Sequence, residues 1–456
     1  MMDYQQAWDY LDRLQFFKIK LGLDSMERFL GRLGEPQRQL RFIHVAGTNG
    51  KGSVASALLA VLSRAGYRAG LYTSPHLSCV RERFRINDEF ISRDDFARQA
   101  TAIHDVLGGD QITYFEFTTA LALLWFATRQ VDVAILEVGL GGRLDATNVI
   151  TPQVGVITNV SMDHQAYLGN TLAEVAAEKA GIIKPGVPLV SGVAADESRA
   201  VVARRCRELS APLYLLGRDF AWYPDDKDAT VAPGDESSAA EAGAAAGAAW
   251  NYRGLHDEIG GLRCRLRGRH QQDNLSLALA TLELLTPVLP VTVDDIRAGI
   301  GEVSWPGRLE YLEVHPSEVD GPRRVLLDGA HNPAGIAALV AALKDDFSGW
   351  RLVVVWASMV DKDVAAGLGQ IAPLADELIL TRPESERSAT PAAMRQMLPA
   401  AARGKAREVD DTAMALEQAW RLTRPEDLVV VAGSLYLVGA ARRLLAGELV
   451  RDEPPE

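Results

Sequence analysis

The chain has little cysteine, no long apolar run and fewer basic than acidic residues. Its three cysteines are odd in number and far apart in a chain of 456 residues, at positions Cys79, Cys206 and Cys264. This spacing favours neither a disulfide framework nor a cysteine-based zinc site, so we expect three small buried side chains. No apolar run reaches the roughly 20 residues that a membrane-spanning helix needs. The first residues also lack a basic region followed by an apolar one, and we expect a cytoplasmic protein with no membrane partner.

The excess of acidic residues gives a formal net charge of -12. This charge argues against nucleic acid as the main partner, and a polyanionic substrate must be held by local positive charge. Hydrophobic residues make up 48% of the chain, which is enough to bury a large core. We expect a globular monomer of two domains.

A glycine-rich stretch in residues 41–53 follows the first expected strand and opens into a helical pattern. Its glycines let successive backbone N–H groups face an anion, and the helix N-terminus adds a positive dipole. Lys51 supplies a mobile cation and Ser53 a hydroxyl for a metal, as in a nucleoside-triphosphate site. The usual P-loop has four residues between its first glycine and the Gly-Lys pair, whereas only Thr48 and Asn49 intervene here. A glycine turn with a surface lysine therefore remains an alternative.

Polar residues follow the next expected strand, residues 67–72, in the turn Thr73–Leu77. Loops at the carboxyl ends of strands line the ligand crevice of an open α/β sheet. Ser74 and His76 could therefore reach the same phosphates as Lys51. For His76, an ordinary surface turn is the alternative.

Glu137 lies in the almost continuous apolar run of residues 131–138, near its end. An unpaired buried carboxylate is energetically expensive, so Glu137 needs a partner, and Mg²⁺ is the obvious one. The hydroxyls of Ser53 and Ser74 suit the same ion, with His164 a less usual ligand. A loop histidine with a structural role is the alternative for His164.

Thr171 and Glu174 form the pattern of a capping box, which predicts a helix from there to Gly181. On this helix Lys179 shares the apolar face with Leu172, Val175 and Ala176. Lysine normally lies on the solvated side. Either its stem packs while the ammonium reaches water, or the nitrogen is held inside for chemistry.

The fold class that these patterns predict is α/β, with two domains. The first, residues 1–303, is a P-loop ATPase-like domain with a mostly parallel sheet, and residues 224–249 within it form an exposed, mobile insertion rich in Asp, Gly, Ser and Ala. Pro306 and Gly307 break regular structure where a second β/α pattern begins. The second domain, residues 304–456, is smaller and Rossmann-like, with strands expected at residues 324–327, 352–356, 377–381 and 427–432.

Six motifs occur in register along the chain: Ala46–Ser53, Thr73–Leu77, Leu136–Asn148, Glu178–Ile182, Trp305–Arg308 and Asp328–Pro333. Together they resemble the folylpolyglutamate synthase and dihydrofolate synthase family within the Mur ligase superfamily. The shortened glycine loop is the form that these ligases use. The insertion and the tail after Val450 have no counterpart in the family pattern, and we assign them no function.

The resemblance implies an ATP-dependent amide ligase that adds L-glutamate to dihydropteroate, to reduced folates or to both. The γ-phosphate of ATP passes to a substrate carboxylate, the α-amino group of glutamate attacks the acyl phosphate, and phosphate leaves. Phosphorylation replaces oxide with phosphate as the leaving group. Catalysis is then mainly charge neutralisation and alignment.

The resemblance also implies a role for each matching residue. The expected ATP-binding residues are Thr48, Asn49, Gly50, Lys51, Gly52, Ser53, Asn274, Arg308 and Asp328, with His331 beside them as a catalytic residue together with Lys51 and Lys179. The expected metal ligands are Ser53, Ser74, Glu137, His164 and Lys179. The expected pteroate-binding residues are Thr113, Tyr114, Phe115, Glu116, Leu144, Asp145 and Ala146. Two Mg²⁺ ions and a monovalent cation are the expected ions.

In this family the lysine of the Glu-Lys-Ala-Gly motif is carbamylated, so the resemblance favours a buried and modified Lys179 over a solvent-facing one. Two other functions stay open at this point. A cell-wall ligase of the same superfamily would share the chemistry, although Thr113–Glu116 is more like the folate branch. A nucleotide-switch binding module would have no use for Asp328 and His331.

Overall fold

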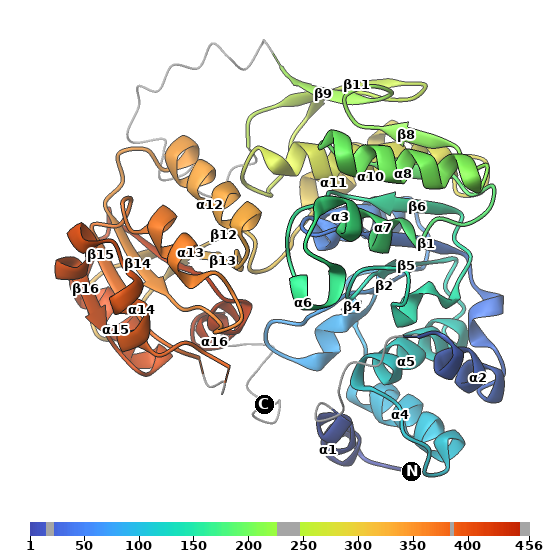
Figure 1. Ribbon diagram of the computed structural model, residues 1–456, viewed down its shortest axis with the longest axis horizontal. Coiled ribbons are helices and arrows are strands. Elements are labelled where there is room, and N and C mark those ends of the chain that lie inside the picture. The colour runs from blue at the N-terminus through green and yellow to red at the C-terminus, as the bar shows by residue number, and fades with distance from the viewer. Residues whose placement is uncertain (15–21, 226–246, 384–386, 447–456) are drawn as a thin grey trace.

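The computed structural model describes residues 1–14, 22–225, 247–383 and 387–446. These residues form two α/β domains, each built around its own sheet, which lie side by side in Figure 1. The domain at the N-terminal end has an eight-stranded sheet, and the one at the C-terminal end has a six-stranded sheet. Residues 226–246, most of the expected insertion, lie outside the described residues. No described helix is long and apolar enough to cross a membrane.

The eight-stranded sheet has the order β4-β3-β2-β5-β1-β6-β7-β8. The six neighbouring strands β2, β5, β1, β6, β7 and β8 are parallel. At one edge of the sheet, β3 pairs antiparallel with β2, and β4 pairs antiparallel with β3. Its strands are β1 (Phe42–Ala46), β2 (Ala69–Tyr72), β3 (Phe84–Ile86), β4 (Glu89–Phe90), β5 (Val133–Glu137), β6 (Val154–Ile157), β7 (Leu189–Ser191) and β8 (Leu213–Leu215). The parallel arrangement brings the loops after β1, β2, β5 and β6 to one edge.

Helices cover both faces of this sheet, which is why its central strands are buried and mostly apolar, with His44 in β1 and Glu137 at the end of β5 as the exceptions. On β1, Ile43 and Val45 face α3, while Phe42 packs with α5 on the other side. The helices are α1 (Tyr4–Arg13), α2 (Asp24–Arg32), α3 (Lys51–Arg64), α4 (Arg93–Leu107), α5 (Tyr114–Thr128), α6 (Gln165–Leu168), α7 (Leu172–Ala180), α8 (Asp196–Glu208), α10 (His270–Leu285) and α11 (Val293–Glu302). The 3₁₀ turns in this domain are η2 (Pro36–Gln39), η3 (Val80–Arg83) and η4 (Ala146–Val149).

A separate antiparallel sheet adjoins α10, with the order β11-β10-β9. Its strands are β9 (Ala221–Pro224), β10 (Trp250–Arg253) and β11 (Glu258–Leu262). Trp222 on β9 donates a hydrogen bond to Asp273 of α10 at 2.7 Å. All three cysteines are free and buried, as expected from the sequence.

The second domain has the strand order β12-β13-β17-β14-β15-β16, with only β12 antiparallel to its neighbour. Its strands are β12 (Glu310–Val314), β13 (Arg323–Asp328), β14 (Leu352–Trp356), β15 (Glu377–Leu380), β16 (Ala406–Glu408) and β17 (Leu428–Ala432). Its helices are α12 (Pro333–Asp346), α13 (Val364–Ile371), α14 (Pro391–Met397), α15 (Thr412–Leu422) and α16 (Leu435–Ala446), with the 3₁₀ turn η5 (Ala400–Lys405). The sequence pattern indicated the four inner strands but missed the edge strands β12 and β16, which are only partly buried.

Candidate active site

The glycine loop lies between the end of β1 and the start of α3. Gly50 has a φ of 80°, and a Cβ at this position would collide with the side chain of Asn274 on α10. Glycine is therefore required by both conformation and space. The same close approach places Asn274 against the loop.

The loop after β6 holds the glycine loop in place. Thr48 donates its N–H to the carbonyl oxygen of Asn159 at 3.1 Å, and Asn49 donates its N–H to Asn159 Oδ1 at 3.0 Å. These two amides are therefore already bonded to protein. The N–H groups at the start of α3, from Lys51 to Ser53, have no intrahelical acceptor and are the amides suited to an anion.

Lys51 and Glu137 bring opposite charges together at the carboxyl edge of the sheet. Lys51 Nζ donates to the carbonyl oxygens of Gly47 and Thr48, each at 3.2 Å. It also lies 3.9 Å from Glu137 Oε1, and the other oxygen of Glu137 accepts the N–H of Ser74 at 3.1 Å. Burial raises the pKa of Glu137, while the ammonium of Lys51 opposes that shift.

Lys179 is buried on α7, and its residue is only 3% exposed, which favours the alternative in which the nitrogen is held inside. The capping box that starts this helix is confirmed, with Thr171 and Glu174 bonded reciprocally. Burial and the charge of Lys51 lower the pKa of Lys179 to about 7, against the opposite effect of Asp163 and Asp145. The charge of Lys51, in the glycine loop, therefore acts on the Lys179 nitrogen.

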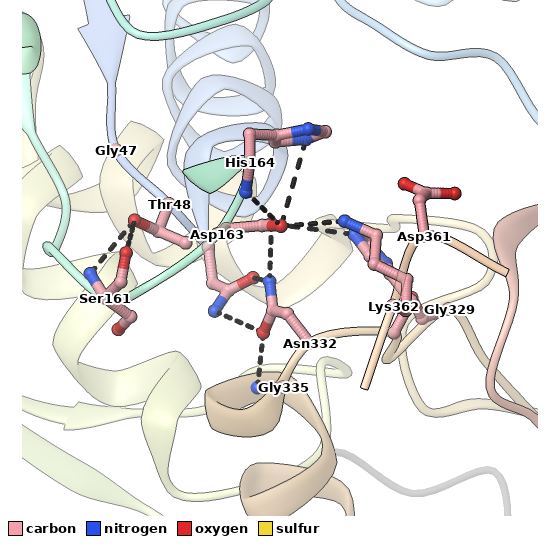
Figure 2. A network of polar contacts seen from close by, with 12 residues as sticks. Gly47, Thr48, Ser161, Asp163, His164, Gly329, Asn332, Gly335, Asp361 and Lys362 are labelled. Carbon is pink, nitrogen blue, oxygen red and sulfur yellow. Dashed lines mark hydrogen bonds and ion pairs between the residues drawn. The ribbon is translucent and has the colours of Figure 1, made fainter. Parts of the chain in front are cut away.

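Asp163, in the loop after β6, is the centre of a polar network between the two domains (Figure 2). Its Oδ1 accepts from Lys362 Nζ at 2.7 Å and from the N–H of His164 at 2.9 Å, and its Oδ2 accepts from Asn332 Nδ2 at 3.0 Å. Burial alone would raise the pKa of Asp163, but Lys362, His164 and Asn332 hold it well below its usual range. Asp163 is therefore ionised at neutral pH.

Asn49 and Asn332 form a second bridge between the domains. Their side-chain amides donate to each other at 3.0 and 3.2 Å. Asn332 also caps α12, because its Oδ1 accepts the N–H of Gly335 at 2.8 Å. The glycine loop of the first domain is thereby tied to a helix N-terminus of the second.

The expected metal ligands are only partly assembled. Ser74 and Glu137 are in contact, and Ser53 is buried in the first turn of α3. His164 has a side chain that is 43% exposed, and its Nε2 lies 4.0 Å from Asp163. Within the described ranges, no cluster of three or more His, Cys, Asp or Glu side chains could hold a metal ion. A metal here would depend on hydroxyl oxygens and substrate phosphates in addition to Glu137.

The expected residues of the second domain lie at the carboxyl end of β13 and in the loops next to it. Asp328 is buried, and its carboxylate accepts the N–H groups of Leu309 and Ala330, each at 2.9 Å. Burial raises its pKa, while Arg308 opposes the shift. His331 Nδ1 lies 2.8 Å from the carbonyl oxygen of Gly329. Its Nε2 is 3.9 Å from Asp163. Burial lowers the pKa of His331 to about 4, so the imidazole is neutral at pH 7.

The two expected pteroate segments meet at the loop after β5. A Cβ at Gly139 would collide with the ring of Phe115, and Asp145 accepts the N–H of Leu140 at 2.8 Å. Thr113 and Glu116 form a capping box at the start of α5, so their side chains are largely occupied in starting that helix. Leu144–Ala146 leads into η4, where Ala146 is part of the core.

Known proteins resemble this chain along most of its length. Residues 45–282 match the family "Mur ligase middle domain" and residues 307–435 match "Mur ligase, glutamate ligase domain". A "Dihydrofolate synthase/folylpolyglutamate synthase" of Bacillus subtilis is 31% identical over 97% of this chain and 99% of the relative. The chain belongs to this family of Mur ligases.

A second relative and a solved structure differ in how much of their own length this chain covers. The chain is 34% identical to a "Probable bifunctional folylpolyglutamate synthase/dihydropteroate synthase" of Haloferax volcanii, over 97% of this chain and 50% of that relative. It therefore spans about half the length of that protein. The solved structure of Escherichia coli FolC in complex with DHPP and ADP has a TM-score of 0.83 and 30% identity, and the match covers 97% of both chains.

Asp163 and Lys362 were not among the site residues that sequence reasoning assigned to this Mur ligase. Lys362 lies in the loop after β14, and Asp328 is the last residue of β13, so the rule about carboxyl ends of parallel strands could have indicated Lys362. Asp163 lies beside the predicted His164, but only the docking of the second domain reveals its partners.

Proposed function

We propose that this chain adds L-glutamate to dihydropteroate, to reduced folates or to both, with ATP as the source of energy and an acyl phosphate as intermediate. The observation that carries the proposal is the position of the glycine loop, which is joined to the second domain through Asn49 and Asn332. Family membership supports it, as does the E. coli relative solved with DHPP and ADP. We also infer a cytoplasmic monomer.

The proposed reaction passes through an acyl phosphate, and the charged groups of the site stabilise its steps. The carboxylate of the pterin substrate attacks the γ-phosphorus, and the bond from that phosphorus to ADP breaks. Lys51 and the first amides of α3 stabilise the charge on the transferring phosphoryl group. The glutamate amine then attacks the acyl carbon, phosphate leaves, and one proton is released.

Mg²⁺ fits the donors around Glu137. The side chain of Glu137 is 6% exposed and its partners are Lys51 and Ser74, so a cation beside it would lower the cost of its burial. The hydroxyls of Ser53 and Ser74 and the imidazole of His164 complete the proposed ligand set. When bound, Mg²⁺ would neutralise phosphate charge and align the γ-phosphate. We also propose the second magnesium ion and the monovalent cation expected for the family.

Lys179 is the proposed site of carbamylation. The pKa of about 7 leaves a large share of the amine neutral at physiological pH. The neutral nitrogen forms a bond to the carbon of CO₂ and loses one proton, which gives a carbamate with a negative charge. Such a group would orient a magnesium ion from the buried face of α7. Asn274, Arg308 and Asp328 are proposed nucleotide contacts, with His331 beside them.

One assay tests the proposed function. Purified protein is incubated with ATP, Mg²⁺, L-glutamate and either dihydropteroate or tetrahydrofolate, and the pterin products and ADP are measured together. We expect ADP release to depend on both glutamate and a pterin. Release without any acceptor would indicate a nucleotide switch, and activity only with a muropeptide acceptor would indicate a cell-wall ligase.

A further inference from the structure

Arg83 is a buried arginine at the end of η3, and its residue is only 7% exposed. Its Nε donates a hydrogen bond to His76 Nδ1 at 2.8 Å. Its Cζ lies 5.2 Å from the centre of the Tyr114 ring. Across the described part of the chain, no carboxylate lies within ion-pair distance of the Arg83 guanidinium.

This set of partners is unusual for a buried charge. A guanidinium has five N–H donors, and an unpaired charge in the interior is expensive. Arg323 is about as buried as Arg83, but its guanidinium has protein acceptors. Its Nη1 donates to the backbone carbonyl oxygens of Asp320, Gly321 and Pro322. The hydrogen bonds of Arg83 to described residues use Nε alone, which leaves its two Nη groups for a ligand.

The position of Arg83 indicates which ligand that is. The backbone of Arg83 accepts the N–H of Thr73 at 3.1 Å, which fixes η3 to the loop that carries Ser74. On the other side, the guanidinium covers Tyr114 of the pteroate segment. Glu137, on which the charge of Arg83 acts, is already bonded to the N–H of Ser74. Arg83 therefore lies between the loop after β2, which carries Ser74, and the pteroate segment. A substrate carboxylate that is phosphorylated beside Ser74 and Glu137 would lie next to it.

We propose that Arg83 binds the carboxylate of the pterin substrate, the group that is phosphorylated and then joined to glutamate. This inference rests on the proposed function. One carboxylate oxygen attacks the γ-phosphorus while the other accepts from the Nη groups of Arg83. The same oxygen gains negative charge when the glutamate amine adds to the acyl carbon, so Arg83 stabilises that step as well. Lysine cannot replace it fully, because an ammonium lacks the planar pair of donors.

The experiment compares Arg83→Gln and Arg83→Lys with a matched control, Arg85→Gln. Arg85 lies two residues along, and its guanidinium covers Phe90 at 5.4 Å, so the control removes a similar stacked arginine outside the proposed site. Affinity is measured by calorimetry for dihydropteroate and for its carboxamide, in which the carboxylate is replaced. Circular dichroism and ADP binding establish that each variant is folded.

We expect Arg83→Gln to weaken dihydropteroate binding by roughly 10- to 100-fold and to leave carboxamide binding unchanged. Arg83→Lys should give an intermediate loss of affinity with a lower kcat, and Arg85→Gln should behave as the wild type. Equal losses for the two ligands, or no loss for either, would overturn the proposal. If Arg83→Gln does not fold, Arg83→Lys with wild-type affinity and kcat would overturn it too. A wild-type protein that ligates no glutamate would instead refute the proposed function.

Discussion

The ion pair between Lys362 and Asp163 gives a sharp test of how the two domains cooperate. Lys362→Met removes the ammonium that donates to Asp163 at 2.7 Å and leaves a side chain of similar length. The two side chains are only 15% and 10% exposed, so water replaces the lost partner poorly. We expect the variant to fold normally, because the pair joins the domains and does not belong to the core of either.

The expected cost follows from what remains around Asp163. Removing one partner of a fully buried ion pair costs about 3 to 5 kcal/mol. Asp163 keeps its hydrogen bonds from Asn332 and from the N–H of His164, so a smaller loss of roughly 1.5 to 3 kcal/mol is expected for the contact between the domains. This corresponds to a roughly 10- to 100-fold fall in the population of molecules in which the two domains are in contact through Asp163, and kcat should fall by a similar factor.

The assay combines ligation kinetics with a distance measurement between fluorophores placed on the two domains. Asp163→Asn and the double variant complete a mutant cycle, in which a coupling energy of the same size is expected. Lys344→Met is the matched control, because Lys344 is exposed on α12 of the same domain. Wild-type kinetics and distances in Lys362→Met, with no coupling in the cycle, would refute the reasoning.

The pH dependence of the contact has a definite sign. The folded pKa of Asp163 is depressed, so its stabilising contribution is complete above the unfolded value of about 3.9. The contribution is lost only as the pH falls below that value towards the depressed pKa. The contact should therefore be independent of pH between about 5 and 8, and a loss within that range would contradict the assignment.

Three further predictions concern the proposed catalytic groups. Lys51→Ala should lower the ligation rate by at least about 100-fold, as measured by kinetics. Thermal melting should show that the free energy of unfolding changes by less than about 1 kcal/mol. Near-normal turnover would mean that the glycine loop does not bind the phosphates of ATP. Glu137→Ala should lose activity that excess Mg²⁺ restores only in part, and full restoration in a magnesium titration would mean that Glu137 is not a ligand or is replaceable by water. Lys179→Ala should recover part of its activity with added acetate, and a crystal structure of the wild type should show density beyond the Lys179 nitrogen. Normal activity of Lys179→Ala, with an unmodified lysine in the ATP-bound structure, would refute carbamylation.

Local rules were enough to predict much of the scaffold from the sequence. The glycine loop, the apolar strand that ends at Glu137 and the capping box at Thr171 each depend on residues a few positions apart. The burial of Lys179 followed from helical spacing together with the family motif. One local rule was overlooked, because Thr113 and Glu116 have the same capping-box pattern as Thr171 and Glu174 and start α5 in the same way.

The contacts that assemble the site were decided by the tertiary structure. Asn49 and Asn332 are 283 positions apart, and Asp163 and Lys362 are 199 positions apart. No spacing rule connects such residues, because their proximity depends on the strand order of two sheets and on how the domains dock. The isolation of Arg83 from carboxylates has the same origin, since a sequence shows which charges exist but not which of them remain unpaired once the chain has packed.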